Sequence, residues 1–450
     1  MTTAPLRSAR NAVIAHRLLA AFLALCLLLS VAAQFARLRV GAGHQLFDGD
    51  GFFYYAYLPN LILKGNLDFS AAYARYQPQG PMWSRIVPET GRWSNVWSVG
   101  PAVMWLPGFL LGHLVWFVAR LAGRAGPTDG FDLYHEGGAL AAGLAWSLLA
   151  VLLTYRLCRR LAAPLPAVLA TIAVWAGTPL LAYGFLELDM SHAVGMLVIT
   201  ALLLASIAAR EQPQHPWRWA TCGGLVGLAA LIRPQHAVFA IIPVGAWLLA
   251  SREATVNQDA PRLRFSYLML MLPAAALAFA PQMLTWKAIF GHYLVVAQPN
   301  YFSQLSFAQL LASLFSTRHG YFSWTPLWAP AIAGLLLVPK QWRWLAALVG
   351  VSLLLQMLLN AWARDWSGGE AFGARRLVEI GPGLAIGLAA ILSRLKSRRA
   401  MLGCGLILFM LLYWNLALMA RYYLRAIPHE ATVPVYDFIR ATLLFPFKLR

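Results

Sequence analysis

Two aspartates, Asp48 and Asp50, open a short aromatic stretch directly after the first long apolar segment of the chain. A charged side chain beside the hydrocarbon of a membrane is costly, so a carboxylate at the end of an apolar helix is by default a candidate for function. Such a carboxylate can act as a general base that takes the proton from a hydroxyl group. One aspartate is enough to cap the next helix, so the pair leaves one carboxylate free for chemistry.

A second polar cluster lies between two later apolar segments. It contains Glu187, Asp189, Ser191 and His192. Asp189 or Ser191 could cap the helix that follows, but a cap uses only one of these side chains. We therefore expect this cluster to take part in the chemistry as well.

Basic residues are found near the ends of several other apolar segments. Interfacial snorkelling accounts for many such arginines, but an arginine also binds a phosphate oxyanion well because its planar fork donates two hydrogen bonds. Arginines that face a pair of carboxylates suit the transfer of a sugar from a lipid phosphate. In that reaction the carboxylate deprotonates an acceptor hydroxyl and the basic groups stabilise the departing phosphate. The candidate basic residues are Arg233, Arg318, His319, Arg375 and Arg376.

The elements that must position these residues are membrane helices. The chain of 450 residues is 60% hydrophobic and only 12% charged, which excludes an ordinary soluble enzyme. Its apolar runs predict an all-α, polytopic membrane protein with about 11 transmembrane helices. The predicted spans are Leu18–Ala36, Gly137–Cys158, Val168–Phe185, Ala193–Ala209, Trp219–Ile232, His236–Ala250, Ser266–Ile289, Pro326–Val338, Trp344–Asn360, Leu377–Leu392 and Met401–Met419.

The charges of the loops decide how a twelfth apolar run, Val99–Leu121, is placed. If this run does not span and the N-terminus is cytoplasmic, the cytoplasmic segments carry 17 basic residues and three acidic ones. This agrees with the positive-inside rule, whereas a spanning Val99–Leu121 would reverse every later loop. We therefore predict that the run does not span, and that the other 14 acidic residues lie on the extracytoplasmic side.

This topology also sets the predicted domains and compartment. We expect a transmembrane domain over residues 1–420, with a first extracytoplasmic loop at 37–136 whose interfacial helices include a kinked helix from Phe52 to Leu63. A short extracytoplasmic tail would follow at 421–450. The net charge of +19 is read as orienting the protein and contacting anionic lipid, so no nucleic-acid partner is expected. The four cysteines show no metal-ligand spacing.

Several motifs of the chain resemble the GT-C class of polyprenyl-phosphate-sugar glycosyltransferases. The similarity is greatest to the branch of the protein O-mannosyltransferases and lipid A aminoarabinose transferases, and to a group of bacterial membrane proteins classed with them. It extends over nearly the whole chain. The motifs are Asp50-Gly-x-x-Tyr54-Tyr55-Ala-Tyr57-Leu58-Pro59, Gly100-Pro-x-x-x-Trp105-Leu-Pro107-Gly-Phe, Ser191-His192-Ala, Arg233-Pro-Gln235, Arg318-His-Gly and Phe372-Gly-Ala-Arg375-Arg376.

The resemblance implies a role for each candidate residue. An aspartate of the first outer loop would be the catalytic base, with Asp50 as the best match and Asp48 as the runner-up, and Glu187 or Asp189 would assist. The substrate would be bound by Tyr54, Tyr55, His192, Arg233, Arg318, His319, Arg375 and Arg376. The partners would be a polyprenyl-phosphate-linked sugar donor, a glycan, lipid or protein acceptor, and membrane lipids. The active site would face the extracytoplasmic side of a bacterial cytoplasmic membrane.

The chain departs from the mannosyltransferase pattern in two ways. It lacks their Asp-Glu pair and their His-Pro-Pro element, which leaves the sugar and the acceptor open. A divalent metal is used by some members of the class, but we favour a site without metal or other cofactor. Two other classes also need arginines at an outer membrane face: a transporter or flippase of lipid-linked sugars, and a ligase of lipid-linked glycans. A transporter commonly shows internal repeats, which this sequence lacks.

Overall fold

The computed structural model describes residues 3–40, 46–76, 84–256, 264–298, 301–302 and 305–446. Within these ranges the chain forms helices and two isolated β-bridges, Ile86 with Trp93 and Phe302 with Ala363. Helices suit a chain this apolar, because a helix satisfies its backbone hydrogen bonds internally where lipid offers no partner. The expected all-α membrane architecture is confirmed.

Among the described residues, one helix corresponds to each of the eleven predicted spans. These helices are α1 (Thr3–Val40), α6 (Leu133–Arg159), α7 (Pro164–Ala176), α8 (His192–Glu211), α9 (Pro216–Ile232), α10 (Ile241–Val256), α12 (Met271–Phe290), α15 (Trp328–Leu335), α16 (Arg343–Trp362), α17 (Gly381–Arg394) and α18 (Arg398–Tyr423).

The other helices and turns connect them or lie beside them; all are short except α5, which has 22 residues. The α-helices of this second group are α2 (Gly49–Tyr55), α3 (Tyr57–Ile62), α4 (Ser70–Tyr76), α5 (Gly100–Leu121), α11 (Phe265–Met269), α13 (Phe307–Phe315), α14 (Tyr321–Trp324) and α19 (Val435–Leu443). The remaining helical turns are the π-turn η1 (Ala182–Leu186) and the 3₁₀ turns η2 (Pro234–Ala240), η3 (Lys340–Trp342) and η4 (Arg375–Leu377).

By length and composition, eight helical segments of the described chain could each cross a membrane; they contain α1, α5, α6, α8, α10, α12, α16 and α18. Four of the predicted spans contain shorter helices: α7, α9, α15 and α17 have 13, 17, 8 and 14 residues. A straight helical crossing needs about 20 residues. Most of the side chains of α7 and α17 are buried, so these short helices lie inside the bundle.

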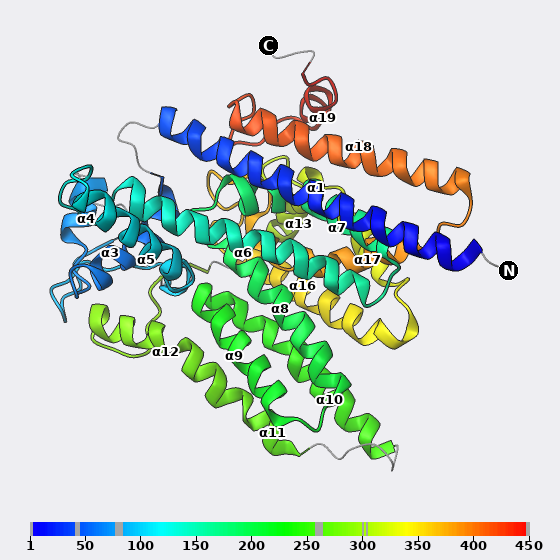
Figure 1. Ribbon diagram of the computed structural model, residues 1–450, viewed down its shortest axis with the longest axis horizontal. Helices are drawn as coiled ribbons and strands as arrows, with labels where there is room; N and C mark the ends of the chain where they lie inside the picture. The colour runs from blue at the N-terminus through cyan, green and yellow to red at the C-terminus, as the bar shows by residue number, and fades with distance from the viewer. Residues whose placement is uncertain are drawn as a thin grey trace.

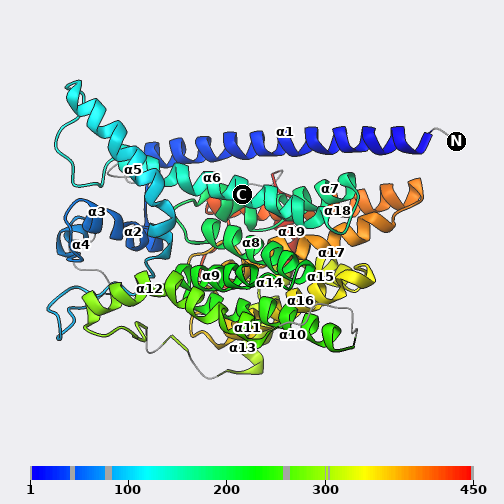
Figure 2. The same cartoon turned by 60° about the horizontal axis from the view of Figure 1, so that its bottom comes forward.

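The bundle has two distinct ends. Helices α2 to α5 gather at one of them, here called the loop end, and the N-terminus lies toward the other (Figures 1 and 2). At this opposite end, here called the basic end, Arg160 pairs with Glu211 at 3.1 Å and Arg210 pairs with Glu253. The arginines that follow α6 and end α8 therefore lie together, as the predicted topology requires.

Helix α5 begins and ends on the same side of the bundle. Gly100 at its start lies against the backbone of Leu231 and Ile232, where α9 reaches the loop end. Its other end leads to Asp132, which caps the start of α6. Helix α5 is long and apolar enough to span a membrane, so the non-spanning placement that the loop charges predict stays a prediction.

Glycines allow the closest helix contacts. In α5, Gly108 lies against the backbone of Gly138 in α6, and in α9, Gly227 lies against that of Ala275 in α12. A Cβ at either position would overlap the neighbouring carbonyl oxygen. Small residues let membrane helices approach closely enough for van der Waals packing, which must replace the hydrophobic effect in lipid.

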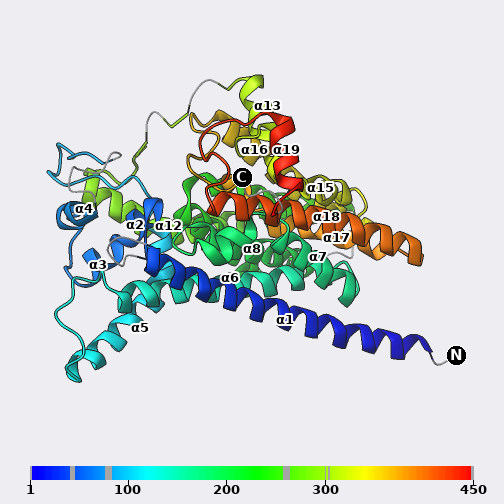
Figure 3. The ribbon, with the colours of Figure 1, turned by 90° about the horizontal axis from the view of Figure 1, so that it is seen from above.

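The aromatic stretch after Asp50 differs from its prediction as one interfacial helix kinked at Pro59. It forms two helices, α2 and α3, which meet at Ala56. The aromatic rings are buried and stack on other residues of the first loop: Phe52 on Tyr76 and Phe53 on Trp97, each with ring centroids 4.0 Å apart. These rings form the core of the loop end, and this rigid layer holds the N-terminal turn of α2. Figure 3 shows α2 to α4 grouped at this end of the molecule.

Candidate active site at the loop end

An ion pair between Asp50 and Arg375 lies at the centre of the candidate site. The Asp50 carboxylate is in the first turn of α2, and its Oδ2 is 3.0 Å from Nη1 of Arg375 in the turn η4. The side chain of Asp50 is 31% exposed and that of Arg375 is 16% exposed. The two residues are 325 positions apart in the chain, yet the fold brings together the first acidic motif and the last basic one.

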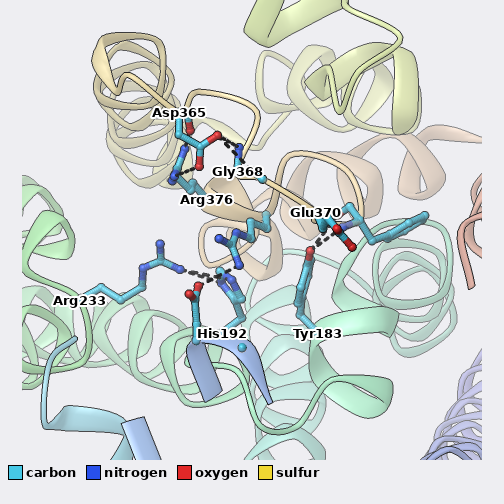
Figure 4. A network of polar contacts seen from close by, with 12 residues as sticks. Tyr183, His192, Arg233, Asp365, Gly368, Glu370 and Arg376 are labelled. Atoms are coloured by element: carbon cyan, nitrogen blue, oxygen red, sulfur yellow. Dashed lines mark hydrogen bonds and ion pairs between the residues drawn. The ribbon is translucent and has the colours of Figure 1, made fainter. Parts of the chain in front are cut away.

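A loop of small residues holds the Arg375 side chain. Gly368 has φ +81°, and a Cβ there would lie 3.2 Å from Nε of Arg375. Asp365 accepts hydrogen bonds from the backbone of Gly368 and Gly369 and pairs with Arg376 at 3.0 Å. Figure 4 shows Asp365, Gly368 and Arg376 on one side of the network and Arg233 and His192 on the other.

A buried carboxylate that was not predicted from the sequence, Glu379, lies beside Arg233 and His192. Glu379 is 1% exposed, and its Oε1 is 2.6 Å from Nδ1 of His192. The same oxygen is 3.7 Å from Arg233 and 3.6 Å from His236. Gly195 faces it, and a Cβ there would lie 2.9 Å from Cγ of Glu379. The signal was present, since an acidic residue inside an apolar segment is by default a candidate for function.

The predicted residues His192 and Arg233 therefore meet around Glu379. Nη1 of Arg233 lies 3.2 Å from the His192 ring nitrogens, and the Tyr183 ring packs on the His192 ring with centroids 4.6 Å apart. Arg233 follows α9 and His192 begins α8, so both side chains belong to the loop end. Together with Arg375 they place three basic groups around one carboxylate, Asp50.

Asp189 and Glu187, the two acidic residues of the second polar cluster, have different partners. Asp189 is 2% exposed and pairs with Arg37 of α1 at 2.7 Å; its other oxygen accepts a hydrogen bond from the backbone of Asp48 at 3.4 Å. It therefore holds α1 against the start of α2. Glu187 instead accepts a hydrogen bond from the Tyr423 hydroxyl at 2.7 Å and lies within the electrostatic reach of Arg375.

Asp48, Tyr54 and Tyr55, three further predicted site residues, have different surroundings. Asp48 is the N-cap of α2 and accepts from the backbone of Gly49 at 2.7 Å. Tyr54 hydrogen-bonds Ser191 and lies near Asp50 and Arg233, which places it in the candidate site. Tyr55 is fully buried, stacks on Phe47 and donates to the carbonyl of Gly130. Its position in the core of the first loop gives it a structural role rather than the predicted contact with substrate.

Arg318 and His319 lie at the edge of the site. His319 has a positive φ of 58°, is buried, and its Nδ1 is 3.0 Å from the carbonyl of Ser367. It thereby supports the loop that holds Arg375. The backbone of Arg318 is fixed by Ser316, and among the described contacts none joins its guanidinium to Asp50 or Glu379.

The pKa values of Asp50 and Glu187 are shifted in opposite directions. Burial alone would raise the pKa of Asp50, but Arg375, Arg233, Trp97 and His192 outweigh it and hold this pKa below its usual value. Burial dominates at Glu187 and raises its pKa in spite of the Tyr423 hydrogen bond. Asp50 is thus held as an anion beside guanidinium groups that can also donate hydrogen bonds to a phosphate. In the described part of the chain, no group of three or more histidine, cysteine, aspartate or glutamate side chains is arranged to hold a metal ion.

Comparison with known proteins supports the resemblance stated from the motifs. The profile of the dolichyl-phosphate-mannose-protein mannosyltransferase family matches residues 134–286, about a third of the chain. No curated protein sequence matches the chain significantly.

Solved structures extend the comparison to the whole fold. ArnT from Cupriavidus metallidurans, solved with bound undecaprenyl phosphate, is similar with a TM-score of 0.54 at 12% identity, covering 96% of this chain and 72% of its own. Its apo state gives a TM-score of 0.52 at the same identity and coverage. An oligosaccharyltransferase of Archaeoglobus fulgidus has a TM-score of 0.40 at 13% identity, over 95% of this chain and 54% of its own; we draw nothing from that weaker similarity. The chain therefore has the all-α membrane fold of the GT-C class of glycosyltransferases.

Proposed function

We propose that this protein transfers a sugar from a polyprenyl-phosphate donor to a hydroxyl-bearing acceptor at the loop end of the bundle. The observation that carries the proposal is the pairing of Asp50 with Arg375 at 3.0 Å beside Arg233 and His192. It combines a carboxylate base with cationic groups for a phosphate, which is the pair of functions that this transfer needs. The GT-C fold and the mannosyltransferase profile support the same reaction class.

In the proposed reaction Asp50 takes the proton from the acceptor hydroxyl. The acceptor oxygen forms a bond to the anomeric carbon of the sugar as the bond from that carbon to the phosphate oxygen breaks. The electron pair of the broken bond stays on the polyprenyl phosphate, where Arg375 and Arg233 stabilise the added charge. Displacement in a single step inverts the anomeric configuration.

The donor phosphate has a second effect on Asp50. In the structure Arg375 stabilises the ionised form of Asp50 and lowers its pKa. A phosphate that takes hydrogen bonds from Arg375 shares this stabilisation, and so makes Asp50 more basic when the donor is present. The ion pair would thus keep the base ionised in the empty site and strengthen it in the loaded site.

The proposed orientation places this site on the extracytoplasmic side. The basic end, with Arg160 and Arg210, would face the cytoplasm, as the positive-inside rule favours. The acceptor is then a glycan, lipid or protein outside the cytoplasmic membrane of a bacterium. A reporter fused near Arg160 should be active only if it works in the cytoplasm, and the opposite result would reverse the assigned sides.

The test of the function is transfer by purified protein in one detergent, with a panel of polyprenyl-phosphate sugars and water or a simple alcohol as acceptor. We expect release of polyprenyl phosphate by the wild type and loss of release in Asp50→Asn. Binding of the donors without any release would favour a transporter of lipid-linked sugars. Release only from diphosphate-linked glycans would favour a ligase.

We also propose that the reaction needs no metal. Arg375 and Arg233 supply the positive charge that a divalent ion would otherwise bring to the leaving phosphate. Transfer should therefore be unchanged after treatment with EDTA. A loss of activity that Mg²⁺ or Mn²⁺ restores would contradict this proposal.

A further inference from the structure

A small cavity with both apolar and amide side chains in its lining lies beside the arginines of the site. It has a volume of about 20 Å³ and is lined by Gln235, Tyr301, Phe302, Gln356, Leu359, Asn360 and Arg376. Two of these residues are close in the chain to the proposed phosphate ligands. Gln235 is two positions after Arg233, and Arg376 is next to Arg375. A group bound to the phosphate ligands would thus lie next to this cavity.

Two amides in α16 supply polar groups to this cavity, whose accessible lining is otherwise mostly apolar. Gln356 and Asn360 are one helical turn apart and only 3% and 5% exposed, in a helix that is otherwise mostly apolar. A buried amide is costly unless it is hydrogen-bonded, and amides in membrane helices often serve to join two helices. Among the described residues, the partner of the Gln356 amide nitrogen is the backbone carbonyl of Gln235, at a long distance of 3.5 Å.

The cavity is connected to the phosphate ligands by hydrogen bonds. When the amide of Gln235 is oriented with its oxygen towards Arg233, this oxygen accepts from Nε and Nη2 of Arg233 at 2.8 and 3.1 Å. The amide NH₂ of Gln235 then remains available as a donor. On the other side, Arg376 is placed by its pair with Asp365 and by the Tyr301 ring, 5.5 Å below its guanidinium.

The size and chemistry of the cavity restrict its occupant. A volume of about 20 Å³ is enough for one small polar group, because a single water needs roughly 10–15 Å³ of such space. Amides both donate and accept hydrogen bonds, as a hydroxyl does. None of the seven lining residues is acidic and one, Arg376, is a cation, so the cavity offers no carboxylate to the ammonium group of an amino sugar and places a like charge beside it.

We infer that this cavity binds the terminal hydroxymethyl group of a neutral hexose carried by the donor lipid, with Gln356 and Asn360 as the residues that select it. The inference rests on the proposed function, because it takes the phosphate of the donor to be bound by Arg233 and Arg375. It adds the class of sugar: a neutral hexose is preferred over a pentose, over a 6-deoxyhexose and over an amino sugar.

The test compares undecaprenyl phosphate, undecaprenyl-phosphate glucose and the 6-deoxyglucose analogue, with both binding and transfer measured. We expect the wild type to favour the glucose lipid over the 6-deoxy lipid by about tenfold, the effect of one or two hydrogen bonds. Gln356→Leu and Asn360→Leu should each reduce this preference towards unity and leave the affinity for undecaprenyl phosphate unchanged. Ser352→Ala, a buried change one turn earlier in α16 and outside the cavity, is the matched control and should keep the preference.

The outcomes separate this inference from the proposed function. Equal binding and transfer of the glucose and 6-deoxy lipids by the wild type would leave the transferase intact and show that the cavity holds an ordered water only. If the wild type binds the glucose lipid better but transfers nothing, the subsite stands and the transferase fails. Weaker binding of undecaprenyl phosphate itself in Gln356→Leu or Asn360→Leu, at unchanged thermal stability, would assign the amides to the phosphate and overturn the inference.

Discussion

Two arginine–aspartate pairs at the loop end have similar distances but different surroundings. Arg37 and Asp189 are 2.7 Å apart, and the Asp189 side chain is 3% exposed and also bound to the backbone of Asp48. Arg375 and Asp50 are 3.0 Å apart, and the Asp50 side chain is 31% exposed. The Asp189 carboxylate is closed off and fastens α1 to α2, whereas the Asp50 carboxylate is open to a ligand. An ion pair at a membrane site is thus better judged by what else reaches the carboxylate than by its distance.

The largest expected difference between Asp50 and Asp48 is in the rate of transfer. Asp50→Asn keeps the shape of the side chain but removes the base, so transfer should fall by roughly 10²- to 10⁴-fold. Asp48→Asn is the matched control, because Asn also caps a helix well, and it should change the rate by less than about threefold. Steady-state transfer rates at saturating donor provide the measurement. Equal losses in the two variants would remove the distinction between Asp50 and Asp48.

Substitution of Arg375 should mainly lower the affinity for the donor lipid, whereas substitution of Arg37 should mainly lower the stability of the protein. Arg375→Ala removes a charge-assisted contact to the donor phosphate and should weaken binding of undecaprenyl phosphate by roughly 10- to 100-fold. Arg37→Ala leaves Asp189 buried without its partner and should cost about 3 kcal/mol of stability with little change in affinity. Lipid binding and thermal unfolding in detergent test both. A loss of affinity in Arg37→Ala that matches that of Arg375→Ala, at unchanged stability, would contradict the assigned roles.

The pH dependence should distinguish Glu187 from Asp50. Burial raises the pKa of Glu187 above its usual 4.5, so the folded protein binds this proton more tightly than the unfolded chain does. Its favourable contribution is then complete below pH 4.5 and is lost as the pH rises through the raised pKa. Glu187→Gln should therefore melt at a higher temperature relative to wild type at pH 8 than at pH 5.

The contribution of Asp50 to stability depends on pH in the opposite direction to that of Glu187. Its pKa is held below the usual 3.8, so its contribution is present above that pH and is lost only as the pH falls through the lowered value. Protonation of Asp50 should thus not limit transfer between pH 5 and pH 8. For Glu187, by contrast, the prediction would be contradicted if the melting temperature of Glu187→Gln relative to wild type fell as the pH rises. That result would show that the site favours the ionised form of Glu187.

The smallest expected effect concerns the cap. Asp48→Ala removes the oxygen that accepts from the backbone of Gly49 and should cost roughly 1 kcal/mol of stability. Transfer at low temperature should remain near the wild-type level. Thermal unfolding of Asp48→Ala beside Asp48→Asn separates the cap from a catalytic role, since a large rate loss in the alanine variant alone would point to a direct function.

The candidate site was only partly accessible from the sequence. Asp50, His192, Arg233 and Arg375 were predicted from their types and positions at the ends of apolar segments, and the structure brings them together. Glu379 was passed over although its apolar neighbours mark it as a candidate, because its partners His192, Arg233 and His236 are more than 140 positions away in the chain. Tyr55 was placed with the substrate because it stands beside Tyr54, but successive residues of a helix point in different directions.

By itself the sequence determined the helical membrane class, the eleven apolar segments and the position of the polar clusters between them, since these follow from local composition and the length of each run. Only the tertiary structure decided which carboxylate of each motif fastens the fold and which faces Arg375. That choice depends on contacts between α1, α2 and the turn η4, which are distant in the chain. The amides of α16 likewise acquire a common cavity with Arg376 only when the helices pack.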